Sequence, residues 1–171
     1  MQKALFLDRD GVINIEKDYL YKIEEFEFID GIFDLCHYYQ TNGYKIFIVT
    51  NQSGIARGYY NEDDFFQLSS WIIKEFKKNN INIQKIYYCP HHPDITGECD
   101  CRKPHAKMLF DAKNEFDIDL KNSVMIGDKE RDIEAGLNAG LNETYLYDES
   151  KTIKRSKATK IVSKLEDIYR C

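Results

Sequence analysis

Residues 4–12 of this 171-residue chain read ALFLDRDGV. Residues 4–7 are an apolar run with the length of a short buried strand, and they lead directly into the carboxylates Asp8 and Asp10. Gly11 then permits a sharp turn, because glycine adopts backbone angles that are closed to other residues. The segment predicts a buried strand with two acids at its carboxyl end.

Strands and helices are predicted to alternate along the rest of the chain. Apolar runs predict strands at 45–49, 86–88, 124–126 and 143–146. Helical spacing or flanking turns predict four helices: one at 32–39, one after a possible cap at Asn61 in which Phe65, Leu68, Ile72 and Phe76 recur at helical spacing, one at 106–115 and one at 131–139. Pro104 is expected in the first turn of the third of these helices. The alternation predicts an α/β, Rossmann-like fold whose sheet is mainly parallel, with helices on both faces. We expect a single domain over residues 1–171, with a basic surface segment at 150–160.

Composition limits the function classes. Hydrophobic residues make up 43% of the chain and aromatic residues 13%, which is typical of a globular protein. The formal net charge of -5 disfavours general binding of nucleic acid or anionic membranes. No signal-peptide pattern and no apolar run of about 20 residues is present, so we expect a cytoplasmic protein without a membrane partner. Cys36 is expected in the core, and Cys171 as an ordinary terminal thiol.

Polar residues follow several of the predicted strands. Thr50, Asn51, Gln52 and Ser53 follow the strand at 45–49, and they offer hydroxyl and amide donors to a phosphate. In open α/β sheets, ligands bind beyond the carboxyl ends of the strands. An ordinary polar turn would have the same composition, so this segment alone does not predict a site.

Two more groups complete the set of charged residues. Arg102 and Lys103 are cations suited to phosphate. Asp128 follows the strand at 124–126, and Asp132, four residues on, either supports that site or stabilises a helix N-terminus.

Asp8 and Asp10 lie so close in sequence that their charges repel each other, and burial would favour the neutral form of at least one. A divalent cation resolves this conflict, and Mg²⁺ prefers oxygen ligands. Asp128 is a candidate for a further carboxylate ligand of the same ion.

A second metal site is predicted between residues 89 and 101. Cys89 and His91 form a C-x-H pair, and Cys99 and Cys101 form a C-x-C pair after a short loop. Three thiolates and one imidazole suit tetrahedral Zn²⁺, and four protein ligands indicate a structural ion. A disulfide with spare thiols is the alternative, which a reducing compartment disfavours.

The motifs D-x-D-G at 8–11, T-N at 50–51, K-P at 103–104 and G-D at 127–128 together resemble the haloacid dehalogenase (HAD) phosphatase superfamily. The resemblance implies that Asp8 is the nucleophile, forming an aspartyl-phosphate, and that Asp10 is first general acid and then general base. It further implies that Thr50 and Lys103 hold the transferring phosphoryl group. Mg²⁺ would bind the side chains of Asp8 and Asp128 and the backbone carbonyl of Asp10.

Longer strings narrow the resemblance: FLDRDGVIN, FEFIDG, VTNQSGIARG, YYCPHHP, CDCRKPH and IGDK are similar to the D-glycero-D-manno-heptose 1,7-bisphosphate 7-phosphatase family. That likeness implies a capless monomer that removes the C7 phosphate of a phosphorylated sugar. The product, heptose 1-phosphate, would supply ADP- or GDP-heptose for surface glycans such as lipopolysaccharide. By family position, the expected substrate-binding residues are Glu16, Lys17, Asp18, Tyr19, Thr50, Asn51, Gln52, Ser53, Arg102, Lys103 and Lys129.

Two other functions stay open at this point. Histidinol-phosphate phosphatase shares the zinc loop and all four catalytic motifs, and only overall likeness separates it from the heptose enzymes. A non-catalytic phosphate-binding regulatory module is the alternative from another class, which the intact set Asp8, Asp10, Lys103 and Asp128 disfavours.

Overall fold

The computed structural model describes residues 1–170; Cys171, and with it the expectation of an ordinary terminal thiol, lies outside the described residues. The strands are β1 Lys3–Leu7, β2 Tyr44–Asn51, β3 Ile83–Cys89, β4 Val124–Gly127, β5 Glu143–Tyr147 and β6 Lys160–Val162. The helices are α1 Ile32–Thr41, α2 Glu62–Lys78, α3 Pro93–Thr96, α4 Lys107–Phe116 and α5 Glu130–Asn138, with short 3-10 turns at Ile23–Glu25, Leu120–Asn122 and Leu165–Ile168. Each predicted strand and helix is therefore present, with ends shifted by a few residues.

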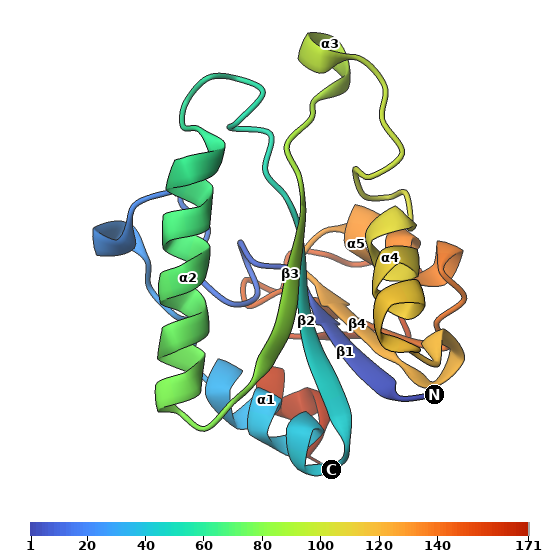
Figure 1. Cartoon of the computed structure of the whole chain (residues 1–171). Helices are drawn as coiled ribbons and strands as arrows, with labels where there is room; N and C mark the ends of the chain where they lie inside the picture. Colours follow the sequence, from blue (N-terminus) through green and yellow to red (C-terminus); the bar gives the residue numbers. More distant parts are fainter. Residues whose placement is uncertain (171) are drawn as a thin grey trace.

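The six strands form one parallel sheet in the order β3-β2-β1-β4-β5-β6. The order reverses beside β1, because the chain first builds outward through β2 and β3 and then returns to place β4 on the other side of β1. Helices that follow the two halves cover opposite faces: α1 and α2 lie on one side of the sheet and α4 and α5 on the other (Figure 1). The predicted α/β fold is confirmed, and its ligand crevice is expected at the carboxyl ends of β1 and β4.

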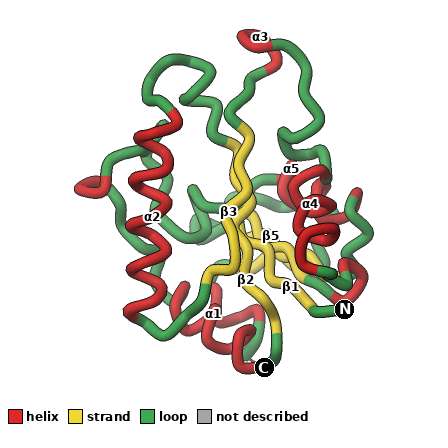
Figure 2. The backbone as a smooth tube through the Cα atoms, in the orientation of Figure 1, coloured by secondary structure: helices red, strands yellow, loops and turns green. Residues whose placement is uncertain are grey.

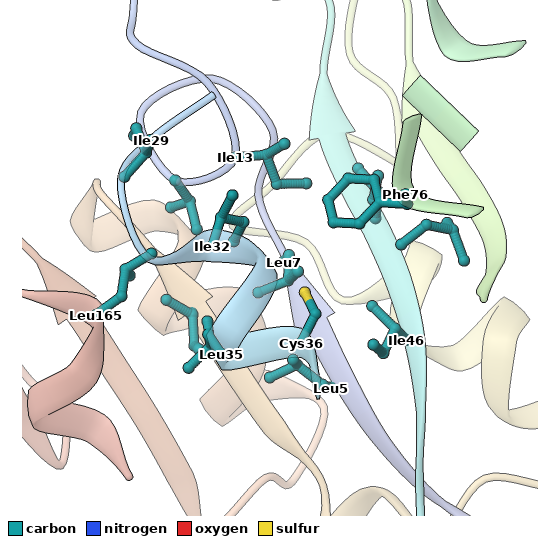
Figure 3. Packing of buried hydrophobic residues seen from close by; sticks show 14 of the residues in the cluster. Leu5, Leu7, Ile13, Ile29, Ile32, Leu35, Cys36, Ile46, Phe76 and Leu165 are labelled. Atoms are coloured by element: carbon teal, nitrogen blue, oxygen red, sulfur yellow. The ribbon is translucent and has the colours of Figure 1, made fainter. Parts of the chain in front are cut away.

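Alternating residues of β1 supply both halves of the core. Leu5 and Leu7 pack with α1 and α2 in one buried cluster, while Ala4 and Phe6 pack with α4 in the other. Figure 3 shows the first cluster, in which Cys36 from α1 points at the sheet. Cys36 has no exposed surface, so its predicted place in the core is confirmed. Because both faces of β1 are covered, its register is fixed and the position of Asp8 is fixed with it.

Two local features differ from what the sequence predicts. The segment 150–160 is exposed or half-buried, so its predicted place at the surface is confirmed, but its last residue begins a strand that was not predicted, β6, in which Ile161 pairs with Leu146 of β5. Three residues are too few to give a periodic signal, so this edge strand depends on its neighbour. Pro104 precedes helix α4, whose N-cap is Ala106, and it does not lie in the first helical turn.

The connection between β3 and α4 is the most extended loop in the tube view, and the short helix α3 lies at its tip (Figure 2). This loop contains the predicted zinc ligands, and it returns to the sheet at Lys103. In the part of the chain that is described, no helix combines the length and apolar character that a membrane crossing requires.

Candidate active site

The carboxyl ends of β1, β2 and β4 bring the predicted catalytic residues together. Asp8 follows the last residue of β1, Thr50 lies near the end of β2, and Asp128 follows the last residue of β4. Since these strands are parallel neighbours, their ends meet at one edge of the sheet, beside the point where the strand order reverses.

Asp8 is buried in contact with a lysine. Its Oδ1 accepts a hydrogen bond of 2.8 Å from Lys103 Nζ, which also donates to the carbonyl of Val49 at 2.8 Å and lies 2.8 Å from Asp132 Oδ1. Burial and then the charge of Asp132 raise the pKa of Asp8 well above its usual value. Burial alone would lower the pKa of Lys103, but the carboxylates of Asp132 and Asp8 outweigh it and raise that pKa. Lys103 is therefore a fixed cation beside the Asp8 carboxylate.

Asp10 is held by donors on both carboxylate oxygens. Oδ1 accepts from Arg9 at 2.9 Å and from Asn14 at 3.0 Å, while Oδ2 accepts from Gln52 Nε2 at 3.1 Å. Arg9 is only 2% exposed, and its guanidinium also donates to the carbonyl of Leu20 at 2.8 Å. Asp10 and Asp8 therefore have different hydrogen-bond partners, since Asp8 is paired with Lys103.

Tyr60 fixes the orientation of Gln52. The Tyr60 hydroxyl donates to Gln52 Oε1, which leaves the amide nitrogen to donate to Thr50 Oγ1 at 2.8 Å and to Asp10. Gly54 is required beside this pair, because a Cβ there would lie 2.1 Å from the Tyr60 ring. Nothing in the sequence marks Tyr60, since its role depends on a contact between side chains eight residues apart.

Asp128 has the chemistry of a cation ligand. Its Oδ1 is buried and has no hydrogen-bond donor among the described residues, while its Oδ2 lies 2.8 Å from Lys129 Nζ. Carboxylate oxygens of Asp8, Asp128 and Asp132 lie within 4.8 Å of one another. A buried acid without a donor inside such a cluster is costly unless a cation is bound, and Mg²⁺ prefers these oxygen ligands. The residues therefore fit Mg²⁺.

Asp132 both supports the site and stabilises the N-terminus of helix α5. It is fully buried, and its Oδ2 accepts from the backbone N–H groups of Asp128 and Lys129 at 3.2 and 3.0 Å. Its other oxygen faces Lys103. Both possibilities that the sequence left open for this residue are thus realised at once.

Asn51 fastens the strand β2 to the segment that carries Lys103. Its side chain accepts from the Lys103 N–H at 3.0 Å and donates to the Lys103 carbonyl at 3.2 Å. Thr50 is fully buried next to it. The polar segment 50–53 therefore positions Lys103, in addition to offering hydrogen-bond donors to a ligand.

A cavity of about 520 Å³ opens over these groups. Its lining contains most of the predicted site residues, namely Asp8, Asp10, Glu16, Asp18, Tyr19, Asn51, Gln52, Ser53, Arg102, Lys103, Asp128 and Lys129. It also contains residues that the sequence did not single out, namely Gly54, Arg57, Tyr60, His92 and Arg131. Burial and the charges of Asp10 and Asp128 raise the pKa of the lining carboxyl Glu16 to about 6.

Two predicted residues do not line this cavity. Thr50 lies beneath its surface, where its hydroxyl accepts from Gln52. Lys17 forms an ion pair with Glu27 at 2.6 Å and donates to the carbonyl of Glu25 at 2.8 Å. Because its ammonium group is bound by Glu27 and by the Glu25 carbonyl, Lys17 does not line the cavity, whereas its neighbours Glu16 and Asp18 do.

The predicted zinc ligands come together in part. Sulfur atoms of Cys89, Cys99 and Cys101 lie within 4.8 Å of one another, and the Cys89–Cys99 separation is 3.7 Å. Zn–S bonds of about 2.3 Å in a tetrahedron would place the sulfurs about 3.8 Å apart, so this separation fits zinc. The Cys89–Cys101 separation of 2.7 Å is shorter than that. His91 is not in the group of mutually close ligand atoms, so the structure gathers three of the four expected ligands.

Residues 100–167 match a family model described as HAD-hydrolase-like. The chain is 60% identical, over 87% of its length and 84% of the relative, to a D-glycero-alpha-D-manno-heptose-1,7-bisphosphate 7-phosphatase of Campylobacter jejuni. It is 45% identical, over 90% of its length and 85% of the relative, to a D-glycero-beta-D-manno-heptose-1,7-bisphosphate 7-phosphatase of Haemophilus influenzae.

Among solved structures, the chain is similar to the D,D-heptose 1,7-bisphosphate phosphatase from B. bronchiseptica complexed with magnesium and phosphate. The TM-score is 0.83 at 26% identity, with 97% of this chain and 95% of that chain covered. The likeness therefore extends over nearly the whole chain.

Proposed function

The chain belongs to the D-glycero-D-manno-heptose 1,7-bisphosphate 7-phosphatase family of HAD phosphatases, and we propose that it hydrolyses the C7 phosphate of that sugar bisphosphate. The other product is heptose 1-phosphate, a precursor of nucleotide-activated heptose for surface glycans such as lipopolysaccharide. The observation that carries the proposal is the pair Asp8 and Asp10, one residue apart in a single cavity, with a buried lysine on the first and amide and guanidinium donors on the second.

Each side chain suits one part of a two-step displacement. The Asp8 carboxylate attacks phosphorus and forms an aspartyl-phosphate, while Lys103 balances charge on the transferring group. Asp10 gives its proton to the departing C7 oxygen, and it later takes a proton from the water that hydrolyses the intermediate. Its contacts with Arg9, Asn14 and Gln52 hold it in place for both transfers.

The side chains of Asp8 and Asp128 and the backbone carbonyl of Asp10 would hold Mg²⁺. When bound, Mg²⁺ neutralises charge between the carboxylates and the phosphate. Cys89, Cys99 and Cys101, with His91 as fourth ligand, would hold Zn²⁺, which fixes the loop ending at Arg102.

Three further features stay predictions. We propose that residues 1–171 act as one domain, as a monomer, and in the cytoplasm. Size-exclusion chromatography with light scattering measures the oligomeric state directly.

The test is phosphate release with Mg²⁺ from both anomers of heptose 1,7-bisphosphate and from histidinol phosphate. Relatives of this chain are named for the alpha and for the beta anomer, so both anomers are assayed. We expect turnover of a heptose bisphosphate in preference to histidinol phosphate. The variant Asp8→Asn should lose at least about 10³-fold in kcat, because it removes the nucleophile, while keeping its circular dichroism spectrum.

The outcomes separate the alternatives. A preference for histidinol phosphate would move the protein to the rival substrate while leaving the chemistry of Asp8 intact. Turnover that survives Asp8→Asn would remove the aspartyl-phosphate mechanism. Absence of turnover with any ester would leave only a phosphate-binding module.

A further inference from the structure

The cations that line the cavity differ in whether they have an acidic partner. Both lysines are paired, Lys103 with Asp8 and Asp132, and Lys129 with Asp128. The remaining cations that line the cavity are Arg57, Arg102 and Arg131, which come from three separate segments of the chain.

These three arginines have no acidic partner. The chain contains six arginines. Among the described residues, Arg9 and Arg170 form ion pairs, whereas no carboxylate lies within 4.0 Å of the guanidinium groups of the three that line the cavity. All three line one cavity, so their positive charges repel one another. Cations that repel one another without a local counter-charge are arranged for an anion that comes from outside.

Contacts hold two of the arginines while leaving donors free. Arg102 donates to the carbonyl of His91 at 3.4 Å. The Arg57 guanidinium lies 5.6 Å from the centre of the Tyr19 ring, and its Nε is buried without a hydrogen-bond acceptor. Arg131 is the second residue of helix α5, one position before the buried Asp132, so the first turn of this helix both lines the cavity and positions Asp132.

We propose that Arg57 and Arg131, together with Arg102, bind the phosphate that the enzyme retains and so select a bisphosphate over a monophosphate. The inference rests on the proposed function, in which the C7 phosphate lies at Asp8 and the second phosphate of the substrate needs a separate counter-charge. Three guanidinium groups match that need, because each donates charge-assisted, often bidentate, hydrogen bonds to phosphate oxygens. A cationic end of a substrate, such as a protonated amine, would be repelled from these arginines.

The experiment compares KM and kcat for heptose 1,7-bisphosphate and for heptose 7-phosphate, which lacks only the second phosphate. Arg131→Ala should raise KM for the bisphosphate by at least about 10-fold and change KM for the monophosphate by less than about two-fold. Arg131→Lys should recover part of the loss, since it restores the charge without the planar fork. Arg57→Lys, which keeps the charge beside Tyr19, should raise KM for the bisphosphate alone by a smaller factor.

Lys113→Ala is the matched control, because Lys113 is an exposed cation on α4 that does not line the cavity. It should leave both KM values unchanged. In the wild type, KM for the bisphosphate should also rise more steeply with ionic strength than KM for the monophosphate, and Arg131→Ala should reduce that difference.

Two results in the variants would overturn the proposal. Equal changes of KM for both substrates would mean that the arginines bind a part that the two substrates share, and no change of KM for either would mean that they do not bind substrate. The proposed function itself is judged on the wild type alone. Failure of the proposed function would appear in the wild type as absent turnover or as a preference for histidinol phosphate. Failure of the arginine proposal would appear in the variants, as an unaltered ratio of KM for the bisphosphate to KM for the monophosphate.

Discussion

At the scale of single residues, Gly11 has a steric role that Gly43 lacks. Its φ is +88°, and a Cβ there would lie 2.2 Å from Asp128 Oδ2. Gly43 also has a positive φ, +84°, but no atom lies within 4 Å of the position of its Cβ. The two glycines therefore share the backbone conformation and differ in whether they touch the site.

This difference gives a prediction. Gly11→Ala should displace the Asp128 carboxylate and raise the Mg²⁺ concentration needed for half-maximal phosphate release, whereas Gly43→Ala should not. Gly43→Ala should lose about 1–2 kcal/mol of unfolding free energy, the cost of a left-handed conformation with a side chain, and Gly11→Ala should lose at least as much, because its Cβ also meets Asp128. Magnesium titrations and urea denaturation of the two variants measure the two effects. Equal Mg²⁺ dependence in both would contradict the steric role of Gly11.

Tyr60 supports Asp10 through Gln52. Tyr60→Phe leaves Gln52 Oε1 without its donor, at a cost of about 1–3 kcal/mol for a buried polar group, and frees the amide to turn away from Asp10. We expect kcat to fall by about 10-fold, with little change in KM, because Asp10 acts in the proposed mechanism on the leaving oxygen and not on binding. Tyr59→Phe alters the adjacent, exposed tyrosine and is the control. If both variants keep the wild-type kcat, the orientation of Gln52 does not depend on Tyr60.

At the scale of elements, helix α2 starts with a capping box. Asn61 Oδ1 accepts from the Asp64 N–H at 2.9 Å, and the Asp64 carboxylate accepts from the Asn61 N–H at 3.0 Å. The apolar residues Leu68, Ile72 and Phe76 lie on one face of the helix and pack against the sheet. The helix therefore has both a fixed start and a buried face.

We expect Asn61→Ala to reduce the unfolding free energy by about 1 kcal/mol through loss of the cap. Asn114→Ala replaces an exposed asparagine within α4 and should be neutral or slightly stabilising, since alanine is the better helix former. Urea denaturation midpoints with equal m-values give both numbers. A loss of the same size in both variants would show that the cap of α2 contributes nothing of its own.

At the scale of the whole molecule, the loop between β3 and α4 joins the cysteine cluster to Lys103, for which we propose a catalytic role. Cys101 is two residues from Lys103, and Arg102 between them reaches back to His91 within the loop. Asn51 fastens the far end of this connection to β2. Order in the loop is therefore expected to control the position of two cavity cations.

Cys99→Ser should lower the zinc content and the Tm, and it should raise KM more than it lowers kcat. Metal analysis, thermal unfolding and steady-state kinetics test these three effects. Wild-type protein stripped of zinc and then reloaded is the control, and reloading should restore both Tm and KM. Unchanged melting and unchanged kinetics in Cys99→Ser would mean that the cluster does not order the loop.

The sequence by itself determined the alternation of strands and helices, the parallel sheet and the acids at the ends of β1 and β4. These features depend on local patterns, namely apolar runs, helical spacing and turn residues, which act over a few neighbours. The motif order was also sufficient to indicate the HAD phosphatases, a membership that the relatives then established.

Only the tertiary structure decided how partners are chosen across the chain. Lys17 turns to Glu27, Tyr60 orients Gln52, and Arg57 joins Arg102 and Arg131 in one cavity. None of these pairings has a fixed spacing, because each depends on which loops the folded sheet brings together. The short strand β6 is of the same kind, since three residues become a strand only when β5 presents a free edge.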